Sequence, residues 1–371
     1  MIADDDWNKD WVCNMETFEN VQIRHAALEA FCSLVLQSHG ASESAAAACA
    51  RALSEASLRG VDTHGVRLLP LYVQWIKGGR LNTSANIKYS KVAPGLGVVD
   101  ADGGFGHVAS YRAVNEAIVL AKETGIGAVA VHRTSHHGAT GTYALHGASQ
   151  GFVTFGFTQS GPGVVAHSGR EPFHGTNPIA FAVPLEREEP VLLDMATSSI
   201  PLNRIYLRRD TGTQLPEDVA VDQEGRMTTD PHRAVSLLPL GGVEYGYKGA
   251  GLATMVELLC TMFTGSAAAV TLPALNDVSR GQPSPLGHFF LVLDGARFRG
   301  MAPLLEVASS LVTKLRACES VAGGQVMAPG DPEKLEKMRR SETGVLVDRA
   351  TWLRLSELAN EKALPVPATL A

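Results

Sequence analysis

From about residue 97 onward, short apolar runs alternate with segments of helical periodicity, and this alternation constrains the possible folds more than any other feature. Apolar runs bounded by glycine or polar turns are typical of strands, whereas apolar residues spaced by a helical turn are typical of helices. Strands are predicted at residues 97–100, 126–131, 152–158, 179–183, 191–193 and 289–294. Helices are predicted at residues 108–124, 143–150 and 247–263. This alternation predicts an α/β fold built in layers around a central mixed sheet.

Helical periodicity without strands dominates both ends of the chain. Residues 21–59 predict two helices separated by Gly40, a third begins near Leu68, and more are predicted at 301–318 and 332–341. We therefore divide the chain into a loose tail, an N-terminal helical segment, a central sheet domain and a C-terminal helical segment, at residues 1–20, 21–95, 96–294 and 295–371. Within the sheet domain, the turn-rich stretch 199–245 is expected to wrap the surface.

Composition excludes several classes of protein. With 371 residues, 45% hydrophobic and 19% charged, the chain is typical of a globular protein and can bury a large core. A net charge of −6 without a dense Lys/Arg tract argues against nucleic acid or a membrane surface as a partner, but permits a small anionic substrate. The five cysteines are scattered and form no CxxC, and neither a signal peptide nor a membrane-spanning run is evident. We expect a soluble cytoplasmic protein.

Two adjacent histidines, His136 and His137, follow the strand predicted at 126–131 and lie in a loop with Gly138 and Gly141. An imidazole titrates near neutral pH and can pass a proton to or from a carbonyl or hydroxyl oxygen. Adjacent side chains cannot both face one point, so at most one of the two is expected to be catalytic. The alternative is that both only hydrogen-bond the loop. Neighbouring histidines have poor ligand spacing and HExxH is absent, so no metal site is predicted.

Other polar residues at loop positions have both a functional and an ordinary interpretation. Asp194 ends a predicted strand, where a carboxylate can orient a histidine, hold a ribose hydroxyl or merely cap a helix. Ser160 lies in a turn that could bind phosphate or sugar oxygens, although turn serines usually bond the backbone. Lys248 precedes the helix predicted at 247–263 and suits a phosphate, or is a solvated charge. His64 with Arg67 could hold a substrate carboxylate, or form a turn that starts a helix.

The glycine-rich run at residues 103–106 does not meet the template of a Rossmann dinucleotide site. No third glycine follows at Ala109, and no acidic residue closes a second strand about 20 residues later. A turn that leads into a helix is the better interpretation of this run.

Seven short motifs occur in one order along the chain. They are Asp62-Thr63-His64-Gly65-Val66, Gly106-His107-Val108-Ala109, Ser135-His136-His137-Gly138, Gly175-Thr176-Asn177-Pro178, Asp194-Met195-Ala196-Thr197-Ser198, Thr229-Asp230-Pro231 and Gly246-Tyr247-Lys248-Gly249. From about Val21 to its C-terminus, the chain therefore resembles the malate/L-lactate dehydrogenase family. That family also holds ureidoglycolate, sulfolactate and diketogulonate dehydrogenases and piperideine-carboxylate reductases.

The resemblance implies nicotinamide-dependent oxidoreduction, with NAD or NADP, on a fold that is not Rossmann. It implies a central mixed sheet that binds the cofactor, and a helical lobe built from both chain ends that completes a homodimer. It makes His136 the acid–base residue, assisted by Asp194 and His64. The cofactor-contact positions that it implies are Ser160, Asp194, Met195, Ala196, Lys248, Gly249, Gly330 and Asp331. The last two belong to a turn where Asp331 replaces the usual glutamate.

Substrate contacts are implied at Thr63, His64, Arg67, Arg170, Thr176 and Asn177. One departure from the family pattern affects them. Relatives often place an arginine at the position of Leu68, whereas this chain has Arg67 one residue earlier, which is about 100° away on a helix. Arg67 therefore need not reach the same carboxylate, and Arg170 is the second candidate.

The motifs and the resemblance together predict reversible hydride transfer between NAD(P) and a small 2-hydroxy or 2-keto acid. Reduction of a cyclic imino acid, such as a piperideine- or pyrroline-carboxylate, is the alternative within the same class. A non-catalytic homologue that binds a metabolite or assembles with other subunits is the alternative from another class. The sequence leaves open the choice between NAD and NADP and the identity of the acid.

Overall fold

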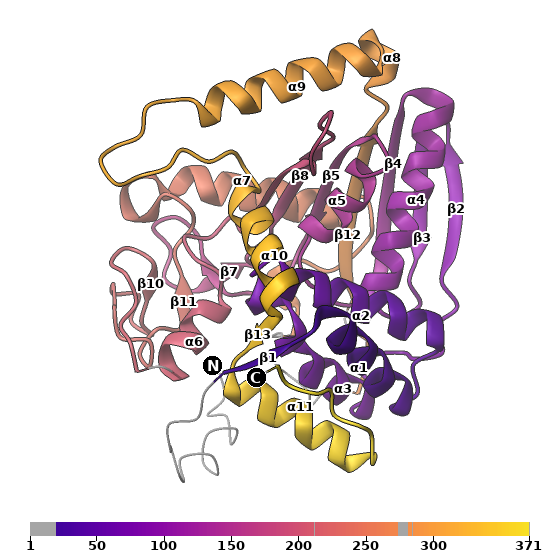
Figure 1. Cartoon of the computed structure of the whole chain (residues 1–371). Coiled ribbons are helices and arrows are strands. Elements are labelled where there is room, and N and C mark those ends of the chain that lie inside the picture. The colour runs from indigo at the N-terminus through magenta and orange to yellow at the C-terminus, as the bar shows by residue number, and fades with distance from the viewer. Residues whose placement is uncertain (1–19, 211, 274–280, 284, 371) are drawn as a thin grey trace.

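The computed structural model describes residues 20–210, 212–273, 281–283 and 285–370 (Figure 1). The tail predicted at residues 1–20 lies almost entirely outside them. Among the described residues, no helix is both long enough and apolar enough to cross a membrane.

A seven-stranded mixed sheet forms the centre of the molecule (Figure 1). Its strands, in spatial order, are β2 (Lys88–Ala93), β3 (Leu96–Asp100), β4 (Ile126–Thr134), β12 (Leu286–Leu293), β5 (Val153–Thr158), β8 (Ile179–Val183) and β9 (Val191–Met195). Only β3 and β4 pair in parallel, and the other neighbours are antiparallel. The predicted mixed α/β sheet is confirmed. Edge strand β2 was not predicted, because its side chains are mostly polar and exposed.

Helices cover both faces of this sheet. Phe290 packs with residues of α4 (Gly106–Thr124), whereas its neighbour Phe289 packs with α7 (Gly242–Met262). Because successive side chains of a strand point to opposite faces, the two helices lie on opposite sides of the sheet. Helix α5 (Gly141–Ala148) packs against β5 and β8. Helix α7 begins at Gly242 rather than near residue 247, so Lys248 lies inside the helix and not before it.

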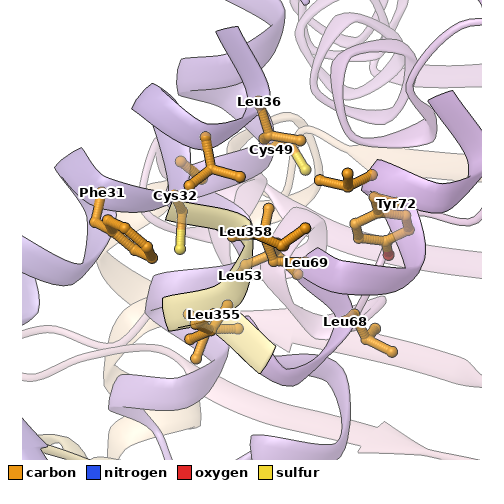
Figure 2. Close-up of a cluster of buried hydrophobic side chains, with 14 of the residues drawn as sticks. Phe31, Cys32, Leu36, Cys49, Leu53, Leu68, Leu69, Tyr72, Leu355 and Leu358 are labelled. Atoms are coloured by element: carbon orange, nitrogen blue, oxygen red, sulfur yellow. The ribbon is translucent and has the colours of Figure 1, made fainter. Parts of the chain in front are cut away.

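A helical lobe is built from both ends of the chain, as predicted. Its helices are α1 (His25–Ser38), α2 (Glu43–Leu58), α3 (Leu69–Lys77) and α11 (Arg349–Glu361). Strand β1 (Val21–Ile23) pairs antiparallel with β13 (Val345–Val347) and joins the two ends. Figure 2 shows the shared core, where Leu355 and Leu358 of α11 lie among Leu36, Leu53 and Tyr72. Burial of these apolar side chains is the main contribution to the stability of the lobe.

The remaining C-terminal helices divide between the two parts of the molecule. Helix α10 (Asp331–Thr343) packs on α2, whereas α8 (Ala296–Arg299) and α9 (Met301–Arg316) lie across the far end of the sheet domain (Figure 1). Val312 of α9 packs with Leu185, which follows β8. The segment 295–371 is therefore not wholly part of the helical lobe.

The stretch at 199–245 does more than wrap the surface. It contributes α6 (Asn203–Asp210) and two strands, β10 (Ala220–Val221) and β11 (Ser236–Leu237), of a small four-stranded sheet. The other two strands are β6 (Val164–Val165) and β7 (Pro172–His174). This sheet has a small hydrophobic core of its own around Leu237. The described residues also form three short 3₁₀ turns: η2 (Asp62–His64), η3 (Val66–Leu68) and η4 (Ala269–Thr271).

Truncation of α11 tests whether the C-terminus is integral to the helical lobe. Leu355→Ala removes a side chain with no exposed surface and should lower the free energy of unfolding by about 2–5 kcal/mol. Leu353→Ala on the same helix, where the side chain is 41% exposed, should cost much less. Urea unfolding monitored by circular dichroism compares the two variants. Equal losses would mean that α11 does not pack as described.

Candidate active site

The loop that follows β4 is fixed to the sheet domain by Ser135. The Gly106 N–H donates to Ser135 Oγ (2.9 Å), and this hydroxyl donates to the Gly104 carbonyl (3.0 Å). A side chain at position 106 would collide with the Ser135 carbonyl, so glycine is required there for the close approach. Because Ser135 is held in this way, the backbone of the neighbouring residue, His136, has a fixed position at the end of β4.

His136 lies where the sheet domain meets the helical lobe. Its Nδ1 lies 2.7 Å from the hydroxyl of Tyr72 in α3, and the Gly138 N–H donates to the same nitrogen at 3.2 Å. The ring of His64, in η2, stacks on it with 6.0 Å between ring centroids. His136 and His64 are both half-buried, and the described residues provide no hydrogen-bond partner for Nε2 of His136. Two imidazoles with accessible surface thus face each other across the lobe boundary.

Burial keeps these imidazoles neutral in the free protein. Burial lowers the pKa of His64 to about 4. Burial also lowers the pKa of His136 well below its usual range, and the neighbouring histidines and the Arg80 guanidinium lower it further. The loss of water around a charged ring is the larger cause in both cases.

His137 has a different environment from its neighbour. It is 1% exposed, with Nδ1 bonded to Ser110 Oγ (2.8 Å) and Nε2 to Thr140 Oγ1 (3.1 Å). Its ring stacks on that of His288 at 4.2 Å between centroids. Both ring nitrogens of His137 therefore have protein partners, and the ring has almost no exposed surface. The two adjacent histidines, which residue type and spacing alone left equivalent, thus have different environments in the structure.

Asp194 lies near the end of β9 and accepts a hydrogen bond from the Gly141 N–H (2.8 Å) at the start of α5. Asp194 as a whole is exposed, but the surrounding protein excludes enough water from its carboxyl to raise the pKa of this group to about 6. Within the described part of the chain, Asp194 hydrogen-bonds no histidine. Of the three interpretations that the sequence left open, orientation of a histidine is therefore not seen, and the carboxylate of this exposed residue bonds the first residue of α5.

Asn177 forms a buried connection between two loops and α7. Its amide nitrogen donates to Glu257 Oε2 (2.8 Å) and to the Ala253 carbonyl (3.1 Å), and its amide oxygen accepts from the Ser160 N–H (3.3 Å). The Thr176 N–H in turn donates to Ser160 Oγ (3.1 Å). Asn177 has no exposed surface, so any effect that it has on a substrate is indirect. Ser160 and Thr176 are partly exposed and border this connection.

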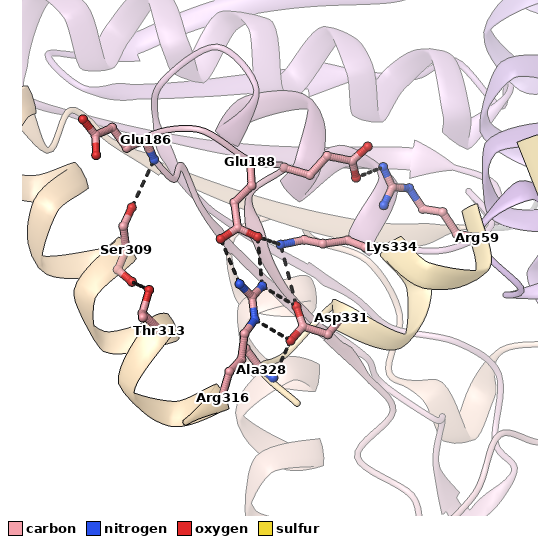
Figure 3. A network of polar contacts seen from close by, with 10 residues as sticks. Arg59, Glu186, Glu188, Ser309, Thr313, Arg316, Ala328, Asp331 and Lys334 are labelled. Atoms are coloured by element: carbon pink, nitrogen blue, oxygen red, sulfur yellow. Dashed lines mark hydrogen bonds and ion pairs between the residues drawn. The ribbon is translucent and has the colours of Figure 1, made fainter. Parts of the chain in front are cut away.

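The turn before α10 is held against β9. The Leu192 N–H donates to the Pro329 carbonyl (3.2 Å), and Gly330, at φ +91°, lies against Leu192. Figure 3 shows the carboxylate of Asp331, which accepts from the guanidinium of Arg316 and from the Ala328 N–H. That guanidinium also holds Glu188, in the β8–β9 turn. Asp331 therefore stabilises the turn, and its carboxylate is already paired.

The segment that follows β9 lies beside the residues that precede α7. The Leu240 N–H donates to the Thr197 carbonyl (2.9 Å), one residue after Ala196, and Gly249 packs tightly against Leu240. Lys248 is exposed, with Nζ 5.3 Å from the ring centre of Tyr245. These contacts place the backbone of α7 at Gly249 close to the segment that follows Met195 and Ala196.

The candidate substrate residues fall into two groups. Thr63 Oγ1 lies 3.0 Å from Nδ1 of His64, and so lies beside His136. Arg67 points toward Asp348, 3.7 Å away at the start of α11. Arg170 is exposed and packs on the turn at Gly225, in the part of the molecule that holds the small sheet.

The residue at the expected arginine position, Leu68, is 6% exposed and belongs to the core of the helical lobe. The backbone places this side chain in apolar surroundings that would not suit a charge. Among the described residues, no three side chains of the His, Cys, Asp or Glu types come together as metal ligands.

Comparison with known proteins finds relatives that match most of the chain. The family model for malate/L-lactate dehydrogenase matches residues 23–356. The chain is 33% identical over 346 residues to a malate dehydrogenase of Pyrococcus horikoshii, covering 91% of this chain and 95% of that one. It is 31% identical over 341 residues to a Δ1-pyrroline-2-carboxylate/Δ1-piperideine-2-carboxylate reductase of Pseudomonas putida, covering 91% and 97%.

Among solved structures, the malate dehydrogenase of Entamoeba histolytica superimposes with a TM-score of 0.88 at 27% sequence identity. The superposition covers 94% of this chain and all of that chain (100%). The whole architecture, and not only the sheet, is therefore shared.

The buried histidines predict how stability responds to acid. Besides His64 and His136, burial lowers the pKa of His107 to about 3 and of His288 to about 4, and lowers that of His137 well below its usual range. The unfolded chain therefore binds more protons than the folded one between pH 6.5 and about 4, and stability falls as pH falls through this window. Each such histidine can contribute up to about 1.4 kcal/mol per pH unit.

Burial raises the pKa values of Asp194 and Glu257, so protonation of these two carboxyls stabilises the folded state as the pH falls. The buried histidines outnumber them, and the net effect of acid is therefore destabilising. Urea unfolding at pH 7.5, 6.5, 5.5 and 4.5 should show a maximum above pH 6.5 and a steep decline below it. A free energy of unfolding that stays constant or increases as the pH is lowered from 6.5 to 4.5 would contradict burial of the rings in neutral form.

Proposed function

This chain belongs to the malate/L-lactate dehydrogenase family, and from that membership we propose that it transfers a hydride reversibly between NAD or NADP and a small 2-hydroxy or 2-keto acid. The family establishes a nicotinamide-dependent oxidoreductase. The observation that supports the reaction most directly is His136, half-buried at the lobe boundary, with Nε2 open and His64 stacked beside it.

In the direction of reduction, a bound nicotinamide would supply the hydride to the keto carbon. His136 hydrogen-bonds the keto oxygen and gives it a proton, so that a C–H and an O–H bond form as the carbonyl π bond breaks. A protonated ring also stabilises the developing alkoxide. In the reverse direction, His136 accepts the hydroxyl proton. His64 borders the same space and is proposed to position the substrate oxygen.

The surface around the end of β9 suits the rest of the cofactor. Asp194 offers an accessible carboxylate that accepts hydrogen bonds, as ribose hydroxyls require. Lys248 offers an exposed ammonium for a phosphate. Met195, Ala196, Ser160, Gly249, Gly330 and Asp331 are proposed to line the same surface. The two last residues form a turn that Arg316 holds in place.

A cyclic imino acid is the second candidate substrate, and the similarity to the Pseudomonas putida reductase supports it. A C=N substrate takes its proton on nitrogen and depends less on an acid aimed at oxygen. Pyruvate, oxaloacetate and a cyclic imino acid, each assayed with NADH and with NADPH, separate the two candidates. A non-catalytic homologue would show neither turnover nor quenching of tryptophan fluorescence by NADH.

The homodimer and the cytoplasmic location remain predictions. Support for association of subunits comes from α7, which exposes five apolar side chains on one side by helical spacing: Val243, Tyr247, Met255, Leu258 and Met262. Exposed apolar side chains grouped in this way are typical of surfaces that another protein covers.

Replacing His136 and His137 one at a time by asparagine distinguishes the proposed catalytic imidazole from the structural one. His136→Asn should reduce kcat by about 10²–10⁴ while NADH binding persists, because proton transfer is lost but the cofactor surface is intact. His137→Asn removes a buried, fully bonded ring and should lower the melting temperature with a smaller effect on kcat. Near-normal turnover of His136→Asn would refute the acid–base assignment.

Arg67 is proposed to hold the substrate carboxylate, because it is on the turn that follows Thr63 and His64. Arg67→Met should raise KM about 10- to 100-fold, the usual effect of losing a charged hydrogen bond, with a smaller change in kcat. Asp348→Asn, which removes the acidic partner but can still cap α11, should leave KM unchanged or lower it. If KM instead rises in Arg170→Met and not in Arg67→Met, Arg170 is the carboxylate ligand.

A further inference from the structure

The hydroxyl of Tyr72 has an unusual position, because it meets the catalytic histidine from the other lobe. Tyr72 has no exposed surface, and its ring packs edge-on against Trp75 and His107, with centroids 5.4 and 5.1 Å away. A buried phenol requires a hydrogen-bond partner. Within the described part of the chain, the side-chain partner of this hydroxyl is Nδ1 of His136, at 2.7 Å.

The other neighbour of Nδ1 determines what Tyr72 must do. The Gly138 N–H points at this nitrogen, and a backbone N–H can only donate. In the resting neutral ring, Nδ1 is therefore an acceptor and the proton is on Nε2. Tyr72 donates to Nδ1 in that state, which is the arrangement that suits both neighbours.

The reaction requires the opposite arrangement at Nδ1. An imidazolium carries protons on both nitrogens, and after Nε2 gives its proton to the substrate oxygen the remaining proton is on Nδ1. Both of these forms need an acceptor beside Nδ1. Gly138 cannot accept through its N–H, whereas a phenol oxygen can, once its O–H bond rotates. Tyr72 is thus the one described group beside Nδ1 that can serve every protonation state of the ring.

We propose that Tyr72 is a positioning residue whose hydroxyl reverses between donor and acceptor, and that this reversal allows His136 to cycle its proton. The proposal rests on the function proposed above for His136. Tyr72 does not touch the reacting atoms, and it transfers no proton itself, because burial raises its pKa well above the usual range of a phenol. It also links the two lobes, so only the assembled fold gives His136 its acceptor.

Removal of the hydroxyl alone tests the proposal. In Tyr72→Phe the ring packing remains, but Nδ1 faces only the Gly138 donor, so every form with a proton on Nδ1 becomes less stable. We expect kcat to fall about 10- to 100-fold with little change in KM, the effect of losing one hydrogen bond to a charged group. The pKa of His136 should fall by about one to two units, because a 10- to 100-fold change in the protonation equilibrium corresponds to that shift.

Other charges around the ring stay constant in this comparison. The titratable or charged groups that act on His136 are His64, His107, His137, His288 and Arg80. Tyr111→Phe is the matched control, because its hydroxyl is also largely buried and accepts from Arg51 Nε (3.2 Å), away from His136. It should lower the melting temperature without changing the titration of His136 or kcat.

Two measurements keep this proposal separate from the proposed function. The ¹⁵N resonances of His136, assigned with His136→Asn, report its titration and tautomer without any substrate, while steady-state kinetics report kcat and KM. If the wild-type protein reduces none of the acids tested, the proposed function fails but the ¹⁵N titration still tests Tyr72. An unchanged titration in Tyr72→Phe, or an equal loss of kcat in Tyr111→Phe, would overturn the role of Tyr72.

A second replacement avoids dependence on the folding of Tyr72→Phe. Incorporation of 3,5-difluorotyrosine at position 72 keeps the hydroxyl and nearly the same shape, but makes its oxygen a weaker acceptor. The titration of His136 should then move in the same direction as in Tyr72→Phe and by a smaller amount. A shift in the opposite direction would also overturn the proposal.

Discussion

The contact between Tyr72 and His136 joins the helical lobe to the end of β4, and the arrangement of the site depends on it. One partner comes from α3 and the other from a loop that Ser135 fixes to the sheet domain. The imidazole is thus held by groups from both lobes, Tyr72 from one and Gly138 from the other. Because the ends of the chain build the lobe that carries Tyr72, residues at both termini influence a site near the middle of the sequence.

Much of the fold could be predicted from the sequence, because buried strands and amphipathic helices have distinct periods. Strands β3, β4, β5, β8, β9 and β12 follow this rule, whereas β6, β7, β10 and β11 have only two or three residues each and were not predicted. Edge strand β2 does not, since its polar side chains carry no alternation of buried and exposed positions. The first turn of α7 was missed because Gly242 and Gly246 have low helix propensity, yet Gly246 and Gly249 pack closely against Pro239 and Leu240. Tertiary packing overrides local preference there.

The site could be predicted only in part, for a physical reason. Residue type and motif identify His136, His64 and Asp194, but burial and hydrogen-bond partners are properties of the folded chain. Asn177 and Asp331 carry polar groups suited to a ligand, and in the structure protein partners occupy those groups. Tyr72 was not predicted at all, because a tyrosine in an apolar helix resembles an ordinary core residue until its hydroxyl is located.

The difference between His136 and His137 supports the choice of His136 as the proposed acid–base residue. Both rings are largely removed from water, which disfavours their charged forms. His137 has each nitrogen bonded to a hydroxyl, so a proton has no route to it. His136 keeps one nitrogen open and has, at the other, a hydroxyl that can reverse. An anionic substrate beside an otherwise neutral cluster of imidazoles favours protonation of the accessible ring, so binding of the acid and loading of the proton become coupled.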